Sequence, residues 1–401
     1  MTFTARKSLL AMAAGMTLAS GTFAQTAPVA PSVTVYGRMD LAVEATNDGA
    51  IARTMLQNYA SRFGIKGERD FGGNFSGIFQ VETAFSPEDG KNQNVSVATT
   101  GTNAGITGGT APNGGGAITG TPSTQSVVTK VGTTTGYLAS RNSFVGLKSN
   151  SLGTILLGNY DTPLKSLDGG GLASTLFAEG DAMEVIIHGK GTKTYGSNWD
   201  NVHTRQNNNL VYISPKFADI VVKVSYSPDE ASTTTTDQPL YSASAEWNNG
   251  TYNFGLATQS KAVSNQAFAM SATKLTMGTK MGDFTAGVAY SILDNNAAAA
   301  ANARRTSNSL IVLGYTQGQG VFKFNYGMSG ESFGGAKDDL TMTSIEANYV
   351  LDKQTTLYAN YAQIMNNSNA KGSFTGADNF PAVGTGGNDP TAVSFGIRYN
   401  F

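Results

Sequence analysis

Apolar and polar residues alternate along most of the chain. Segment 33–45 (VTVYGRMDLAVEA) has valine, methionine or leucine at nearly every second position, with mainly polar residues between them. Segments 283–293 and 321–328 repeat this pattern, and the last segment, 391–401, alternates up to the aromatic residue Phe401. A period of two indicates β-strands that have one apolar and one polar face.

Short turn signals and longer polar connections separate these segments in alternation. Short turns are predicted at 70–74, 150–153, 214–219, 248–250, 282–283, 318–320 and 351–354. Long connections are predicted at 46–56, 86–136, 161–203, 228–238, 261–266, 294–306, 330–338 and 366–390. Seven turns and eight long connections join about sixteen strands, an even number.

We therefore predict an all-β fold, a transmembrane antiparallel β-barrel of about 16 strands over residues 25–401. A soluble β-sandwich would also alternate, but short turns along one edge and long loops along the other favour a barrel. Phenylalanine and tyrosine near the strand ends suit the two membrane interfaces. Every backbone N–H and C=O in hydrocarbon needs a partner, so the sheet must close, and sixteen strands leave a water-filled lumen.

Composition narrows the function further. The 401 residues include 27 Lys+Arg, 28 Asp+Glu and no cysteine, and only 14 % are charged, which is low for a soluble protein. The balanced charge gives no reason to expect a nucleic-acid partner. The absence of cysteine excludes disulfides and thiolate metal sites. We expect no cofactor.

The N-terminus has the pattern of a secretory signal peptide. Arg6 and Lys7 precede an apolar stretch, 8–19, and the small residues Thr22 and Ala24 follow it. We expect residues 1–24 to be the signal peptide, with cleavage after Ala24. A membrane anchor is the alternative, but it would need roughly 20 apolar residues.

Several segments in combination carry a family resemblance. They are 32–45 (SVTVYGRMDLAVEA), 61–85, 140–161, 207–227 and the terminal FGIRYNF. Together they resemble the general porins of the Gram-negative outer membrane, most closely the Neisseria and Burkholderia type, from residue 32 to 401 and more weakly between 228 and 337. The resemblance implies a homotrimer of sixteen-stranded barrels in the cell outer membrane, with a third loop folded into the pore. It also implies passive diffusion of small hydrophilic solutes and ions.

The end of the chain has two compatible interpretations. The resemblance implies that the last strand, with Ile397, Tyr399 and Phe401, is recognised by the outer-membrane insertion machinery. The residues alone indicate that this strand pairs with the first one to close the barrel, with Phe401 facing lipid among interfacial aromatics.

Loop 161–203 is the predicted constriction loop, because it follows the fifth strand, as the constriction loop does in porins. Its middle, 172–189, contains enough apolar residues to pack on an inner wall. Its acidic candidates for the constriction are Asp168, Glu179, Asp181 and Glu184. The basic candidates on the facing strands are Arg38, Arg62, Lys66, Arg141 and Arg205.

These charges predict a transverse field across the pore. Basic residues that match Arg62, Arg141 and Arg205 border the constriction in the resembling porins. Arg141 shares the parity of the lipid face, so it needs a bulge or a position above the membrane. Arginines on rigid strands favour a weak anion preference. The alternative for each residue is an ordinary solvated charge of the lumen.

Catalysis has little support in the sequence. His188 and His203 are the two histidines, and their fifteen-residue separation fits no compact metal-ligand motif. Segment 188–192 (HGKGT) lacks the first glycine of a phosphate loop. We therefore expect no enzyme, no metal and no catalytic residue. The alternatives are a channel with a preferred solute and a barrel enzyme or adhesin.

Overall fold

The computed structural model describes residues 32–89, 95–98, 131–134, 138–168, 176–189, 203–230, 232–233, 237–262, 269–295, 304–377 and 380–401. The predicted signal peptide 1–24 and most of connection 86–136 lie outside these ranges. None of the described helices is long and apolar enough to cross a membrane.

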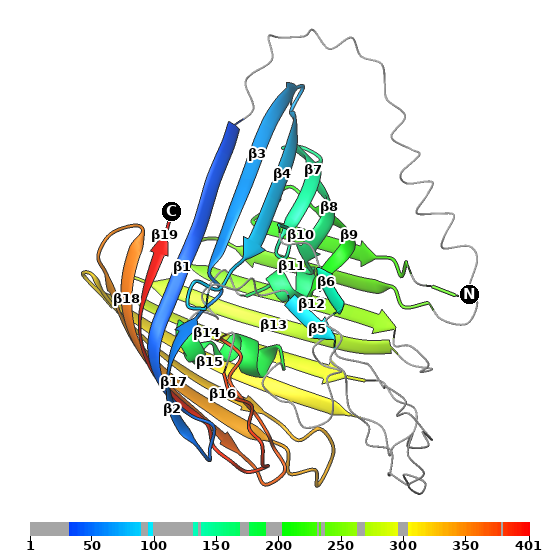
Figure 1. The fold of residues 1–401 in the computed structure, drawn as a ribbon. Helices are drawn as coiled ribbons and strands as arrows, with labels where there is room; N and C mark the ends of the chain where they lie inside the picture. The colour runs from blue at the N-terminus through cyan, green and yellow to red at the C-terminus, as the bar shows by residue number, and fades with distance from the viewer. Residues whose placement is uncertain are drawn as a thin grey trace, which may run out of the picture.

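Antiparallel strands make up the molecule (Figure 1). They are β1 (Ser32–Asn47), β2 (Ala52–Asn58), β3 (Arg62–Gly72), β4 (Phe75–Ala84), β7 (Ser143–Ser149), β8 (Gly153–Asp161), β9 (Arg205–Ile213), β10 (Ile220–Ser227), β11 (Leu240–Asn248), β12 (Tyr252–Ala262), β13 (Ala269–Met281), β14 (Phe284–Asp294), β15 (Arg305–Gln317), β16 (Gly320–Ser329), β17 (Leu340–Val350), β18 (Thr355–Asn366) and β19 (Thr391–Asn400). A separate two-stranded antiparallel sheet, β5 (Val95–Ala98) with β6 (Val131–Thr134), lies in the second long connection.

The sheet closes into a sixteen-strand barrel, as the sequence predicted. Its seventeen strands occupy sixteen positions, because β2 and β3 share one: the first half of β1 pairs with β3 and the second half with β2. Closure comes from β1 and β19, which pair from Arg38↔Asn400 to Asn47↔Thr391. The seven predicted short turns connect β3–β4, β7–β8, β9–β10, β11–β12, β13–β14, β15–β16 and β17–β18.

Phe401 completes the closure. Its backbone N–H donates to the carbonyl of Gly37 at 3.1 Å, and the N–H of Gly37 donates to the carbonyl of Phe401 at 2.9 Å. The Phe401 ring covers the Cα of Gly37 so closely that a side chain there would collide with it. The last residue of the chain is therefore a paired residue of the barrel seam rather than a frayed end.

The predicted parity of the strands holds in the structure. In β14, Val288 and Tyr290 are 43 % exposed on the outside, whereas the intervening Ala289 is buried on the lumen side. Aromatic rings meet near the strand ends, for example Phe284 with Tyr315 at 4.8 Å between ring centroids. This outer surface suits lipid, with aromatic side chains at the interfaces.

The connection after β8 folds into the lumen, where Figure 1 shows its helices inside the sheet. It contains α2 (Pro163–Ser166), a 3-10 turn η1 (Ala178–Gly180) and a π-helical turn η2 (Met183–Ile187). Apolar residues of η2 pack against lumen-facing residues of the wall, including Ala289, Leu310 and Met342. A Cβ at Gly327 would lie 2.9 Å from Ile186 Cγ1, so this glycine allows the loop to approach β16 closely.

Candidate functional site

A cavity of about 550 Å³ lies between the inward loop and the facing wall of the barrel. Nine charged residues line it: Arg38, Arg62, Arg141, Lys165, Arg205, Arg398, Asp161, Asp181 and Glu184. Six of these are basic and three are acidic. Uncharged lining residues come from the junction between β2 and β3 (Tyr59 and Ala60), from the inward loop and from the last long loop, after β18.

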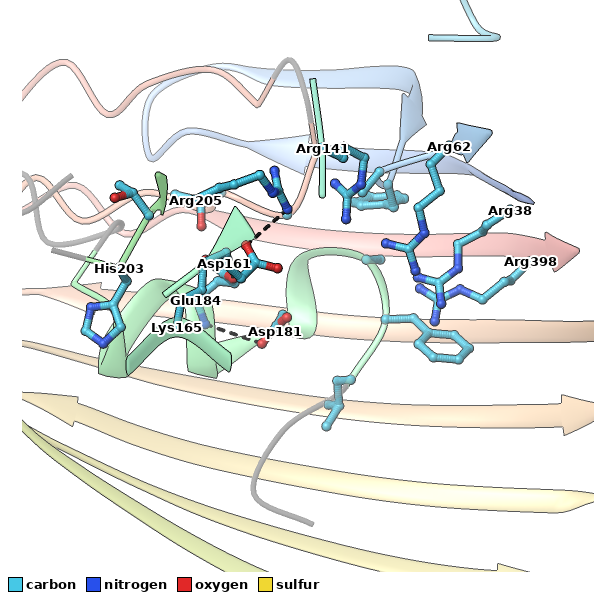
Figure 2. A pocket seen from close by; sticks show the side chains of 18 residues that line it. Arg38, Arg62, Arg141, Asp161, Lys165, Asp181, Glu184, His203, Arg205 and Arg398 are labelled. Carbon is cyan, nitrogen blue, oxygen red and sulfur yellow. Dashed lines mark hydrogen bonds and ion pairs between the residues drawn. The ribbon is translucent and has the colours of Figure 1, made fainter. Parts of the chain in front are cut away.

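Three arginines gather on the wall formed by β1, β3 and β19 (Figure 2). Arg38 of β1 lies directly opposite Arg62 of β3. On the other side of β1, Arg398 of β19 lies opposite Asp40. Arg398 is fixed by an ion pair with the buried Asp40, with its Nε 2.6 Å from Asp40 Oδ2. The ring of Phe177 stacks on the same guanidinium, 3.5 Å from ring centroid to Cζ.

Arg38 and Arg62 have no carboxylate partner among the described residues. Arg38 donates through Nε to the amide oxygen of Asn400 at 3.2 Å. Two like charges side by side in a confined lumen repel each other, and an anion entering between them relieves that repulsion. This part of the wall therefore presents to the cavity two positive charges that form no direct ion pair with a carboxylate among the described residues.

Arg141 and Arg205 reach the cavity from the loop side of the barrel. Arg141 lies before the start of β7, so the alternation of that strand does not direct its side chain toward lipid. It forms an ion pair with Glu82, with Nε 2.5 Å from Oε1. Arg205 opens β9 and pairs with Asp161, with Nη2 3.1 Å from Oδ1. Asn142 joins this group, because its side chain accepts from Arg205 Nε at 2.8 Å.

The inward loop supplies the acidic side. Asp181 Oδ1 accepts from the backbone N–H of Met183 at 3.1 Å, at the start of η2. Glu184 pairs with Lys165 of α2, 3.2 Å from Nζ to Oε1, and this carboxylate raises the pKa of Lys165. The loop is thus fixed by its own charge pairs, with Asp181 and Glu184 at the cavity surface.

Six of the nine predicted constriction residues line this cavity: Arg38, Arg62, Arg141, Arg205, Asp181 and Glu184. The other three do not. Lys66 lies over the ring of Tyr36, 5.1 Å from its centroid, and Asp168 follows α2 outside the cavity lining. Glu179 was expected to face the pore, but it is only 1 % exposed, because η1 is covered by the last loop.

Three charged lining residues were missing from the prediction: Asp161, Lys165 and Arg398. Arg398 has the polar parity of the terminal strand, so the pattern could have indicated it. Asp161 and Lys165 lie at the boundary between strand and loop, where parity does not assign a direction. The sequence contains no signal that the last loop enters the lumen, because its glycines and threonines resemble those of the other long loops.

The two histidines lie together at one end of the inward loop. Their rings stack with centroids 4.1 Å apart, and His188 Nε2 is 3.1 Å from Nζ of the fully buried Lys274. Burial lowers the pKa of His188 to about 3, and Lys274 acts in the same direction. Among the described residues, no group of three or more histidines and carboxylates is arranged to hold a metal.

Comparisons with known proteins give one family match and several solved structures with the same fold. A family model described as Gram-negative porin matches residues 8–370. Among solved structures, the anion-selective porin from Comamonas acidovorans is similar, with 19 % identity and a TM-score of 0.70 over 93 % of this chain and 100 % of that chain.

More distant structures have the same fold. OmpT (in-vitro folded), an outer membrane protein of Vibrio cholerae, is 14 % identical with a TM-score of 0.61, over 95 % of this chain and all of that one. The Salmonella typhi OmpF complex with daunomycin is 13 % identical with a TM-score of 0.59, over 93 % of this chain and all of that one. No curated protein sequence matches the chain.

Proposed function

Because the chain belongs to the Gram-negative porin family, and is therefore a diffusion channel of the outer membrane, we propose that its arginine-lined constriction favours small anions. The observation that carries this proposal is the adjacent pair Arg38 and Arg62, which lacks a carboxylate partner among the described residues. The similar porin from Comamonas acidovorans is anion-selective, which agrees with the proposal.

The charge count supports a modest preference rather than an absolute one. The cavity lining has six cations against three acids. Asp40 and Glu82 lie behind Arg398 and Arg141, and including them leaves six cations against five acids, an excess of one. These two carboxylates are buried, so a passing ion meets the guanidinium groups first. Cations are therefore disfavoured, and still pass through a water-filled lumen.

The constriction residues act on an ion through a narrow and poorly screened gap. The Debye length is about 8 Å at physiological salt, so charges on both sides of a cavity this small act together. Asp181 and Glu184 on the loop and Arg38 and Arg62 on the wall thus produce a field across the pore. Dipolar solutes orient in that field, whereas uncharged solutes are limited by size.

A planar-bilayer experiment tests the proposed function. The full-length channel should conduct in KCl, with a current that keeps rising with concentration as passive diffusion requires. Saturation at low solute concentration would instead support a channel with a preferred solute. Asp181→Asn with Glu184→Gln should increase anion preference, and an unchanged reversal potential would remove these two residues from the constriction.

The remaining proposals concern assembly. The chain forms a homotrimer, and the OmpT neighbour that was solved in a trimer form supports this assignment. The first 24 residues direct export and are removed. The insertion machinery recognises the last strand through Ile397, Tyr399 and Phe401, which lie on the outer face and are each more than 40 % exposed.

A further inference from the structure

The last long loop, between β18 and β19, also enters the lumen. Thr375 and Gly376 line the cavity beside the inward loop. Upstream in the same loop, Ala370 and Phe374 are buried in the apolar cluster that anchors η2 to the wall. The cavity is therefore bounded by two loops that are about 200 residues apart in the sequence.

Glu179 joins these two loops. One of its carboxylate oxygens accepts from the backbone N–H of Gly376 at 2.9 Å, and the other accepts from the N–H of Ala377 at 2.9 Å. The side chain is buried, and burial raises the pKa of Glu179 to about 8, with Glu44 adding to the rise and the two N–H groups opposing it. The Glu179 carboxyl group thus satisfies two backbone N–H groups that would otherwise need another acceptor.

The contact is too close for a side chain. A Cβ on Gly376 would lie 2.5 Å from the carbonyl oxygen of Ala178 and 2.9 Å from Glu179 Oε2. On its other side η1 meets the barrel wall, where Asn325 Nδ2 donates to the carbonyl of Gly180 at 3.2 Å. The 3-10 turn is thus held between the wall and segment 375–377.

We propose that Glu179 is a positioning residue that fixes segment 375–377 as the second wall of the constriction, and so sets the upper size of solutes that pass. Glu179 does not line the cavity, so it acts through Gly376 and Ala377 rather than on the solute. This inference rests on the proposed function in one respect, that the protein is an open channel. It does not depend on which ions the channel prefers. Without the two hydrogen bonds, segment 375–377 leaves the cavity and the pore widens.

Two variants and a matched control test this inference in the full-length channel. Glu179→Ala removes both acceptors. Gly376→Ala keeps every charge but forces the two backbones apart. Glu331→Ala is the control, because Glu331 also accepts two backbone N–H groups in its own external loop, from Gly335 at 2.9 Å and Lys337 at 3.0 Å, away from the cavity.

Single-channel conductance and exclusion of polyethylene glycols of increasing size are the measurements. Glu179→Ala and Gly376→Ala should both raise the conductance, increase the open-channel noise and admit larger polymers, with no change in the sign of the reversal potential. Glu331→Ala should match the wild type in all of these. If Glu179→Ala does not assemble, Gly376→Ala alone decides.

The inference is overturned if the assembled variants keep the wild-type conductance and polymer cut-off. It is also overturned if Glu331→Ala widens the pore equally, because the effect would then be general loosening of the external loops. A wild-type protein that does not conduct would instead refute the proposed function, so the two failures are distinguishable.

Discussion

An arginine placed at Val288 tests which face of each strand meets the membrane. Val288 is 43 % exposed and lies four residues after the start of β14. At about 3.4 Å per residue it is about 14 Å along the strand, or about 10 Å deep once the strand tilt of about 40° is included. That depth is close to the middle of an apolar band about 25 Å tall, where an arginine costs about 2–4 kcal/mol.

Neighbouring valines of β10 provide the controls. Val222 also faces outward but lies only two residues after Ile220, so Val222→Arg should cost about 0–1 kcal/mol. Val221 faces the lumen opposite Glu246, so Val221→Arg should cost little and gains an acidic neighbour. Each 1.4 kcal/mol is about a tenfold change in the folding equilibrium, so Val288→Arg should shift it by about 30- to 700-fold.

Urea titration of refolding into lipid vesicles measures these differences. The expected order of destabilisation is Val288→Arg, then Val222→Arg, then Val221→Arg. Equal stability of Val288→Arg and Val221→Arg would refute the assignment of lipid and lumen faces. A larger loss for Val222→Arg than for Val288→Arg would refute the depth argument.

Three further outcomes follow from single contacts. Deleting Phe401 should lower the amount of protein in the outer membrane more than it lowers refolding into detergent. Equal losses in cell fractionation and in refolding would refute recognition of Phe401 by the insertion machinery and leave its pairing with Gly37 as its role. Phe177→Leu removes the ring that stacks on the Arg398 guanidinium, which should leave this group less firmly positioned at the constriction. The reversal potential should therefore shift toward the value for a cation-selective pore, although no charge changes. Because the folded-state pKa of His188 is about 3, the protein has its full stability above about pH 6.5, where this side chain is neutral in both states. As the pH falls from about 6.5 toward 3, the free energy of unfolding should decrease by about 1.4 kcal/mol per pH unit. Channel noise should therefore rise in acid for the wild type and less for His188→Gln, in which the buried His203, whose pKa burial also lowers, still titrates.

The strands could be predicted because their signal is local. Alternating residues and turn signals, each readable within a few residues, located the seven short turns from β3–β4 to β17–β18. The even number of strands indicated a closed barrel. The split between β2 and β3 was missed. It depends on distant contacts, such as the side chain of Asn58 donating to the carbonyl of Phe85 at 3.1 Å, and on the left-handed backbone of Ala60 (φ 59°).

The candidate site was only partly predictable for the same reason. Parity along β1, β3 and β9 placed Arg38, Arg62 and Arg205 on the lumen side. Parity carries no information within a loop, so Glu179 was expected at the pore although it is buried against Gly376, 197 residues away. A carboxylate in a loop takes its role from its tertiary partners, and no spacing in the sequence identifies them.

Removing Arg38 and Arg62 tests the central claim most directly. Neither arginine has a carboxylate partner among the described residues, so Arg38→Gln with Arg62→Gln leaves no buried acid unpaired. Lys66→Gln is the control, because Lys66 lies on the same strand as Arg62 but outside the cavity.

The measurement is the reversal potential under a KCl gradient, in a planar bilayer, for wild type and both variants. The wild type should favour chloride at low salt, the double variant should shift toward potassium, and Lys66→Gln should stay close to the wild type. The shift should shrink in molar KCl, where the screening length falls to about 3 Å. A double variant with the wild-type reversal potential at low salt would contradict the account, because these arginines would then not set the ion preference of the pore.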